Sequence, residues 1–288
     1  MRKPILIFTA IFAGIVFPFG HAYTFLIRYL IMAILFLAFL DLRVSHKSIQ
    51  REHIWVVLLN LLLPLVFFII LYPLNDTVAM VAFVIAVSPT AANGPIIADL
   101  LRIDVSFVTL SVLLTSISVA FLIPFILPQL MEVSQKIDVS AVLFPVFILV
   151  FIPLLIAQLI RYGSSRIHQK LLAFKGIGFY LFITNVFIAS GKASHFVQMD
   201  KQTGWRTILG IALLSGVLCF LNFSIGRALA KDQSPIATSI ALGRKNNMFA
   251  LWLSLTFTTP VIALGPIFYI VYQNIYNSWQ LWQMEKKS

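Results

Sequence analysis

Long runs of apolar residues alternate with short polar or charged segments along the whole chain. Four of these runs, at 54–75, 77–98, 105–131 and 207–226, contain no charged residue. Each is as long as the roughly 20 residues that an α-helix needs to cross a bilayer. The pattern therefore predicts membrane-spanning helices rather than the amphipathic helices of a soluble core.

Charged residues and clusters of proline and glycine divide the chain into ten predicted spans. We expect them near 4–20, 22–42, 53–73, 76–101, 104–128, 139–162, 170–191, 205–229, 233–258 and 261–283. The start of the chain, with Arg2 and Lys3 before an apolar run, is similar to a signal peptide. No small-x-small cleavage site follows, so we interpret this segment as a retained first helix.

The composition agrees with a membrane protein. Of the 288 residues, 60% are hydrophobic and 11% are charged, and the mean hydropathy is +0.97. A soluble domain of this size could not bury so much apolar surface in one core. We therefore expect an all-α integral membrane protein whose partner is the lipid bilayer. The net charge of +11 is expected to reflect membrane topology and not a nucleic-acid partner.

The residue types that build catalytic and metal sites are sparse. The single cysteine, Cys219, cannot form a disulfide framework or a thiolate cluster alone. The five histidines show no H-E-x-x-H or other metal spacing, and no G-x-S-x-G motif is present. We expect no metal, no cofactor and no enzymatic activity.

The 21 Lys and Arg residues are distributed unevenly between the two sides of the predicted membrane. With a cytoplasmic N-terminus, three fall within spans, four fall outside and the remaining 14 fall inside. By the positive-inside rule, this bias predicts cytoplasmic N- and C-termini, an even number of spans and a multi-pass protein of the cell inner (plasma) membrane. Arg28, within a span, lies near its outer end and can extend to the interface.

The ten spans form two halves, 1–138 and 139–288, each with five spans. Because five is odd, the second half is inverted relative to the first, as in many secondary transporters. The fourth span is interrupted at VSPTAANGPII and the ninth, its counterpart, at ALGRKNNMFA. We predict helix breaks near Ala91–Gly94 and Gly243–Asn247.

Broken helices at mid-membrane depth release backbone donors and acceptors that lipid cannot satisfy. Single prolines such as Pro64, Pro124, Pro145 and Pro153 are interpreted as kinks. The two interruptions differ because each combines proline or glycine with asparagine. We expect them to line a protein-enclosed cavity in which half-helix N-termini attract an anion.

Two stretches resemble the bile acid:sodium symporter family. SPTAANGPIIADLLRIDVSFVTLSVLLTSIS is similar to that family's fourth and fifth helices, and SIALGRKNNMFALWLSLTFTTPVIALGPIFYIVYQNI to its ninth and tenth. The resemblance implies a panel of helices one, two, six and seven beside a core of the other six. It also implies that helices four and nine are broken and cross, and that transport proceeds by alternating access.

This chain departs from the family at the sodium ligands. The family's ninth helix reads Glu-x-Gly-x-Gln-Asn, and its glutamate and glutamine bind sodium. Those two positions are Ala241 and Lys245 here, while the glycine and asparagine are retained as Gly243 and Asn246.

In the fourth helix, the family's Thr-Ala-Ser-Asn falls on residues 90–93, where the serine ligand is replaced by Ala92. Thr115, Ser116 and Ser118 are the hydroxyls that the fifth helix offers.

We hypothesise that the ammonium of Lys245 stands where a sodium ion would bind. It can donate hydrogen bonds to the same oxygens, and it would repel the ion. The chain is then predicted to be a secondary transporter of a small organic anion, a carboxylate or bile-acid-like molecule, that does not use sodium. Lys245 makes protons a candidate coupling ion, because burial disfavours a lysine's charge.

The predicted substrate-binding residues are Thr90, Ala91, Asn93, Gly94, Asn246 and Asn247. The predicted ion or coupling residues are Lys245, Asn93, Thr115, Ser116 and Ala241.

Several alternatives remain. A sodium-coupled symporter using a residual site, or an auxin-efflux-type organic anion carrier, would share the general plan. Arsenite efflux proteins usually need a cysteine in the fourth helix, whereas Cys219 lies in the eighth predicted span. A channel would be expected to show rings of charge or filter carbonyls rather than paired broken helices. Arg244 and Lys245 would be unimportant if they lay in an exposed loop.

Overall fold

A computed structural model describes residues 2–40, 49–131, 138–174, 176–199 and 204–285. Within these ranges the chain forms 14 helices and no strand. The helices are α1 (Arg2–Val16), η1 (Pro18–Tyr23), α2 (Leu26–Leu40), α3 (Arg51–Leu71), α4 (Asp76–Val87), α5 (Gly94–Leu100), α6 (Val105–Leu130), α7 (Val139–Gly163), α8 (Ser165–Ala173), α9 (Ile177–Met199), α10 (Trp205–Ala228), α11 (Pro235–Gly243), α12 (Asn247–Phe257) and α13 (Leu264–Glu285).

Five of the described helices, α3, α6, α7, α9 and α10, are long and apolar enough to cross a membrane. Their outer surfaces carry large apolar side chains such as Ile69, Leu159 and Phe220 in exposed positions. Exposed aliphatic and aromatic side chains over several helices are what a lipid-facing surface requires. The chain is therefore a multi-pass helical membrane protein.

The other five predicted spans correspond to shorter, divided or more polar helices. The described parts of α1 and α2 have 15 residues each. Two further spans are divided, into α4 and α5 and into α11 and α12, at the interruptions predicted from the sequence. The first break begins at Ser88, three residues before the predicted position. Although α13 has 22 residues, its Gln and Asn residues lower its hydropathy below that of the five long helices.

The predicted seventh span, 170–191, was wrong in its bounds. Residues Ser165–Ala173 form the separate short helix α8, and the apolar helix α9 begins at Ile177 and continues to Met199. The helix α8 has polar and basic residues on one side and no buried residue, as expected for a helix at a surface. The membrane-length helix therefore starts after it. Lys192, one of the four basic residues expected outside the membrane, consequently lies within α9.

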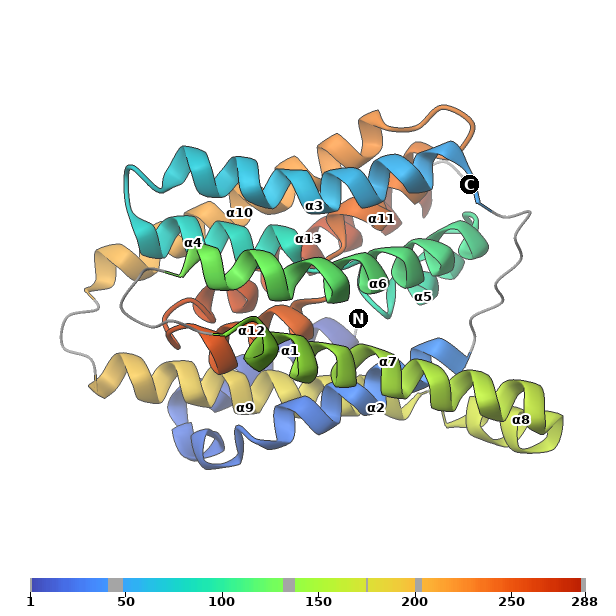
Figure 1. Ribbon diagram of the computed structural model, residues 1–288, viewed down its shortest axis with the longest axis horizontal. Helices are drawn as coiled ribbons and strands as arrows, with labels where there is room; N and C mark the ends of the chain where they lie inside the picture. The colour runs from blue at the N-terminus through green and yellow to red at the C-terminus, as the bar shows by residue number, and fades with distance from the viewer. Residues whose placement is uncertain (1, 41–48, 132–137, 175, 200–203, 286–288) are drawn as a thin grey trace.

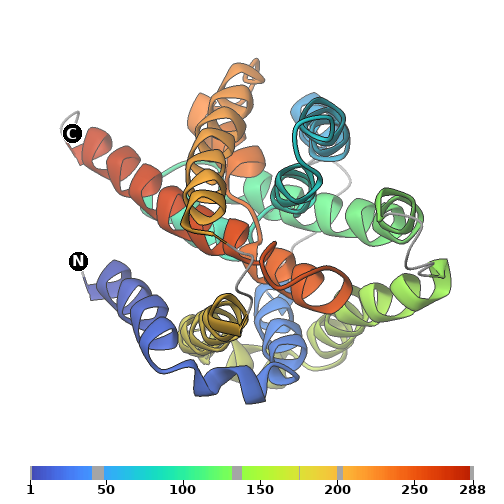
Figure 2. The same ribbon diagram turned by 90° about the vertical axis from the view of Figure 1, so that its left-hand side faces the viewer.

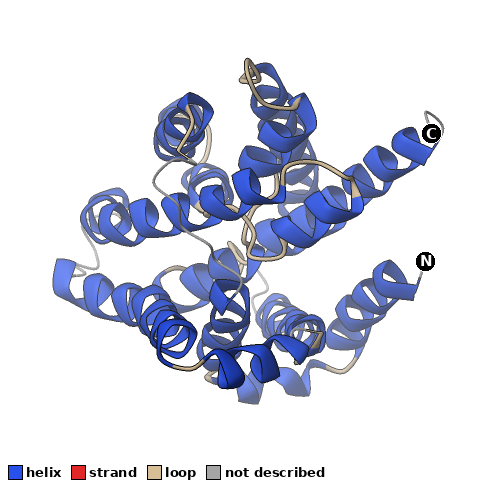
Figure 3. Cartoon of the chain, turned by 90° about the vertical axis from the view of Figure 1, so that its right-hand side faces the viewer, coloured by secondary structure: helices blue, strands red, loops and turns tan. Residues whose placement is uncertain are grey.

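The helices form two groups (Figures 1 and 2). One group contains α1, η1, α2, α7, α8 and α9, and the other contains α3 to α6 and α10 to α13. Figure 3 shows the same arrangement from the opposite end, with α-helices in both groups joined by short loops. The two broken helices belong to the second group.

Local signals explain where the second group's helices begin. Asn75 accepts a hydrogen bond from the Val78 amide at the start of α4, and Asp104 accepts one from the Phe107 amide at the start of α6. Ser234 caps α11, whose first residue is Pro235. Each cap satisfies a backbone donor that the first helical turn leaves free.

Close packing of α10 against α11 depends on glycine. A Cβ atom added at Gly243 would lie 2.7 Å from Phe223 Cα and 2.6 Å from Phe223 Cδ1. A Cβ at Gly226 would lie 2.7 Å from the Thr238 carbonyl oxygen. Because backbone atoms cannot give way, these glycines fix how near the two helices approach.

We predict that Gly243→Ala destabilises the protein by about 1–3 kcal/mol, because overpacking of a tight contact typically costs that much. Gly210→Ala, on α10, is the control, since nothing lies within 4 Å of its added Cβ. Thermal unfolding in detergent can be followed by a thiol-reactive fluorophore, because the buried Cys219 becomes accessible. Equal melting temperatures for the two variants would contradict this packing.

Candidate functional site

The two helix breaks pair with one another through their backbones. Thr90 and Lys245 form an antiparallel bridge. The Ala91 amide donates to the Arg244 carbonyl at 2.8 Å, and the Asn246 amide donates to the Pro89 carbonyl at 2.7 Å. Since lipid offers no hydrogen bonds, this pairing satisfies groups that the missing helical turns would otherwise leave free.

We call the two paired breaks, residues 88–93 and 244–246, the crossing. Side-chain hydroxyls satisfy further backbone groups there. Thr90 Oγ1 donates to the Ala241 carbonyl at 2.6 Å, and the Thr90 amide donates to Thr115 Oγ1 at 3.0 Å. The Thr115 hydroxyl also donates to the Ser111 carbonyl at 2.7 Å. Tyr269, from α13, donates to the Gly243 carbonyl at 2.7 Å. Side chains from α6 and α13 therefore stabilise the crossing, in addition to the backbone hydrogen bonds between the two breaks.

Lys245 is almost completely enclosed, with 1% of its surface exposed. Its Nζ donates to Asn60 Oδ1 at 2.6 Å and to the Ala86 carbonyl at 2.7 Å. Ala86 lies in the last turn of α4, where helix carbonyls are unpaired and the helix dipole favours a cation. The ammonium thus completes the end of a broken helix.

Asn60 is a residue of the candidate site that the sequence analysis missed. It lies on α3, and its Nδ2 donates to the Val87 carbonyl at 3.1 Å while its Oδ1 accepts from Lys245. The available signal was an asparagine well inside the charge-free run 54–75, because an isolated polar residue within a span commonly faces the protein interior. Its partner could not be identified, since the two residues are 185 positions apart.

Arg244 lies beside Lys245 in the chain but has a different environment. Only 3% of its surface is exposed, and its Nε donates to Asn93 Oδ1 at 3.1 Å. Its Nη1 is buried and has no hydrogen-bond partner among the described residues. Asn93 is half-buried and does not cap α5, although it precedes that helix. The pair therefore places an incompletely satisfied guanidinium at the crossing.

Among the remaining predicted residues, some polar atoms form hydrogen bonds within the fold and others have no partner among the residues described. Asn246 Oδ1 caps α12 by accepting from the Phe249 amide at 3.3 Å. Asn247 Nδ2 donates to the Lys245 carbonyl at 3.2 Å, while its Oδ1 and the Ser116 hydroxyl are buried and have no partner within the described ranges. At Gly94, an added Cβ would lie 3.1 Å from Val108 Cγ1, so a larger residue here would require the Val108 side chain to shift by a few tenths of an ångström.

No buried carboxylate neutralises these two cations within the part of the chain that is described. Among the acids whose side chains the structure describes, only Glu52 is buried, with 2% exposed. Its Oε1 accepts from the backbone amides of residues 231, 232 and 233 at 3.3, 2.7 and 3.3 Å. Glu52 precedes Asn60 by two turns of α3, about 12 Å along the helix. The Glu52 carboxylate therefore anchors the α10–α11 loop, and the crossing keeps a surplus of positive charge.

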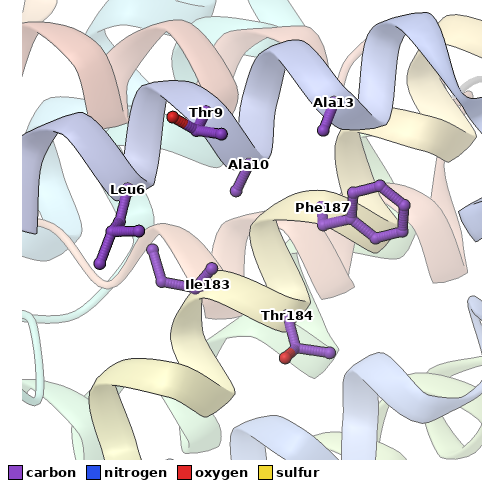
Figure 4. Close-up of a pocket in the computed structure, with 7 residues that line it drawn as sticks. All are labelled: Leu6, Thr9, Ala10, Ala13, Ile183, Thr184 and Phe187. Atoms are coloured by element: carbon purple, nitrogen blue, oxygen red, sulfur yellow. The ribbon is translucent and has the colours of Figure 1, made fainter.

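A cleft elsewhere in the structure has a different character. It has a volume of about 310 Å³ and lies between α1 and α9, lined by small and apolar side chains with two threonines (Figure 4). Its lining residues are Leu6, Thr9, Ala10, Ala13, Ile183, Thr184 and Phe187. None of them carries a charge, so this cleft does not share the cationic character of the paired breaks.

No protein-family model matches this chain, and no curated protein matches its sequence. The functional assignment therefore depends on the residues of the crossing.

We predict that Lys245→Met and Asn60→Leu are each destabilising, because each leaves a buried polar group unpaired at a cost of about 1–3 kcal/mol. In the double variant the loss should be smaller than the sum of the single losses by about 0.5–3 kcal/mol, as expected for residues in direct contact. Thermal unfolding measures all three variants. Lys192→Met is the control, because this half-buried α9 lysine forms no hydrogen bond with other residues that the structure describes. Strictly additive losses would show that the Lys245–Asn60 contact is not energetically important.

Proposed function

We propose that this protein is a secondary transporter of a small organic anion. The observation that carries the proposal is the buried Arg244 guanidinium, which is held by Asn93 and has an unpaired Nη1. A buried cation needs a partner to offset its desolvation. A carboxylate from a substrate would provide that partner, and it would accept charge-assisted hydrogen bonds from the guanidinium and a further hydrogen bond from the Asn93 Nδ2.

Sodium is not expected to couple transport. The Lys245 ammonium already donates to two oxygen atoms, Asn60 Oδ1 from α3 and the Ala86 carbonyl at the end of α4. A sodium ion about 4 Å from this ammonium would be repelled by roughly 4 kcal/mol at an effective dielectric constant of about 20. Position 241 offers no carboxylate, and its carbonyl already accepts from Thr90. After the anion is released, Lys245 would be the group that releases or binds a proton, and it would thereby couple transport to protons.

The proposed architecture is the ten-span inverted repeat, with halves 1–138 and 139–288 and both termini in the cytoplasm. In this scheme α1, α2, α7 and α9 form the panel, and the second group of helices forms the core (Figure 1). Hydrogen bonds support treating these as two bodies. Ser194 to the Ile15 carbonyl and Gln158 to the Phe39 carbonyl join helices of the panel, whereas Lys245 to Asn60 joins helices of the core. Movement of one body against the other would provide alternating access in the plasma membrane.

We predict that Arg244→Gln and Asn93→Ala weaken binding of whichever small carboxylate stabilises the wild-type protein. Loss of a hydrogen bond to a charged group costs about 1.5–3 kcal/mol, so affinity should fall roughly 10- to 100-fold. The measurement is a thermal-shift titration with a panel of mono- and dicarboxylates, followed by Kd determination for the strongest. Lys192→Gln, which also removes one cation, should bind normally. If neither variant alters the Kd, the anion binds elsewhere.

A separate prediction concerns sodium. Replacing sodium by choline should leave the anion Kd of the wild-type protein unchanged, because Lys245 already occupies the oxygen site. Lys245→Gln alone should not create sodium dependence, whereas Ala241→Glu combined with Lys245→Gln restores the missing ligands and should do so. A sodium-dependent rise in the affinity of the wild-type protein would instead support a sodium-coupled symporter with a residual site.

A further inference from the structure

The short helix α8 is fixed to the panel along one side. It follows α7 after a single residue, Ser164, whose hydroxyl accepts a hydrogen bond from the Ile167 amide at 3.3 Å. Leu171 and Leu172 pack against the apolar core. His168 Nε2 lies 2.8 Å from the Leu40 carbonyl at the end of α2. Figure 1 shows α8 below α7 at the end of the molecule opposite the α7 N-terminus.

The opposite side of α8 combines exposed cations with exposed apolar side chains. Arg166 and Lys170 are both exposed, and a spacing of four residues places them next to each other on the helix surface. Ile167 and Phe174 are 51% and 56% exposed. Adjacent like charges destabilise an isolated helix. An anion bound between Arg166 and Lys170 would remove this repulsion.

The cations around α8 have no acidic neighbours in sequence. No Asp or Glu occurs between Asp138 and Asp200. Arg161, in the last turn of α7, has a buried Nη1 without a hydrogen-bond partner among the described residues. The α7–α8 corner, which we define as Arg161, Arg166, Ile167, Lys170 and Phe174, is therefore cationic and partly apolar.

We propose that the α7–α8 corner binds the headgroup phosphate of an anionic phospholipid. Guanidinium groups bind phosphate oxygens in pairs, and a lysine ammonium adds charge. A basic helix with apolar side chains beside its cations lies in the membrane interface, with the apolar side chains among the acyl chains. Basic residues next to a membrane span attract anionic lipid. An acidic protein or a nucleic acid would use the cations but not the exposed Ile167 and Phe174, so lipid fits the surface better.

Binding here would act on the panel and not on the proposed anion site. The His168 contact joins α8 to α2, and α8 continues directly from α7. A phospholipid held by Arg161 and Arg166 would therefore fix the ends of α2 and α7 relative to the membrane surface. The inference does not depend on the substrate, and it would stand if the proposed function were wrong.

The test is retention of lipid by the purified full-length protein. Native mass spectrometry would count phosphatidylglycerol and phosphatidylcholine that remain bound after exchange from detergent, and thermal unfolding would be measured with each lipid. We expect the wild-type protein to retain phosphatidylglycerol preferentially and to melt at a higher temperature with it. Each cation near an anionic surface contributes about fivefold in affinity, so Arg166→Gln with Lys170→Gln should reduce phosphatidylglycerol binding about 25-fold.

Two controls distinguish the corner from the overall charge. Arg102→Gln with Lys231→Gln removes two exposed cations from loops elsewhere and should leave lipid retention unchanged. Arg166→Lys with Lys170→Arg keeps the charge and should retain the lipid, which separates lost binding from lost folding. Equal loss in the Arg102 and Lys231 variant, full retention in the Arg166→Gln and Lys170→Gln variant, or equal stabilisation by inorganic phosphate would overturn the proposal.

Discussion

Four helix ends meet inside the helical core, and their free backbone groups impose the main constraint on this molecule. The ends of α4 and α11 present carbonyls, and the starts of α5 and α12 present amides. The two breaks satisfy part of this demand by pairing with each other, as the Ala91 amide and the Pro89 carbonyl do. Thr90, Tyr269 and Lys245 satisfy more of it. The tight contact at Gly243 is needed because α11 must end where these groups converge.

Lys245 and Arg244 are adjacent in the chain, but their side chains differ in how they contact the groups at these helix ends. The compact ammonium of Lys245 fits against the last turn of α4 and is hydrogen-bonded to Asn60 and Ala86. The larger guanidinium of Arg244 has more donors than Asn93 can accept from, and one of them is left unpaired. A single chain position therefore separates a cation whose ammonium is hydrogen-bonded to the end of a helix from one that keeps a donor unpaired among the described residues.

The sequence allowed prediction of the helical membrane class and of both breaks, because apolar run length and clusters of Pro, Gly and Asn are local signals. The bounds of α9 were wrong, since the amphipathic α8 continues the helical pattern of the chain before it. The partners of Lys245 could not be predicted. Asn60 and Ala86 are separated from it by 185 and 159 positions, and only the packing of α3 and α4 against the break brings them near. Likewise, no local pattern indicated that Asn246 caps α12 while Asn93 binds Arg244.

The distribution of polar contacts bears on how such a protein could move. Lys245 with Asn60, Thr90 with Ala241 and Glu52 with the Asp232 amide all join helices or loops of the second group. His168 with Leu40 and Ser194 with Ile15 join helices of the first. Sliding of packed apolar surfaces breaks no hydrogen bond, whereas separating α3 from α12 would expose a buried cation. In the proposed transport cycle, the crossing would therefore move as one piece with its ligand, and the change of access would come from the surface between the groups.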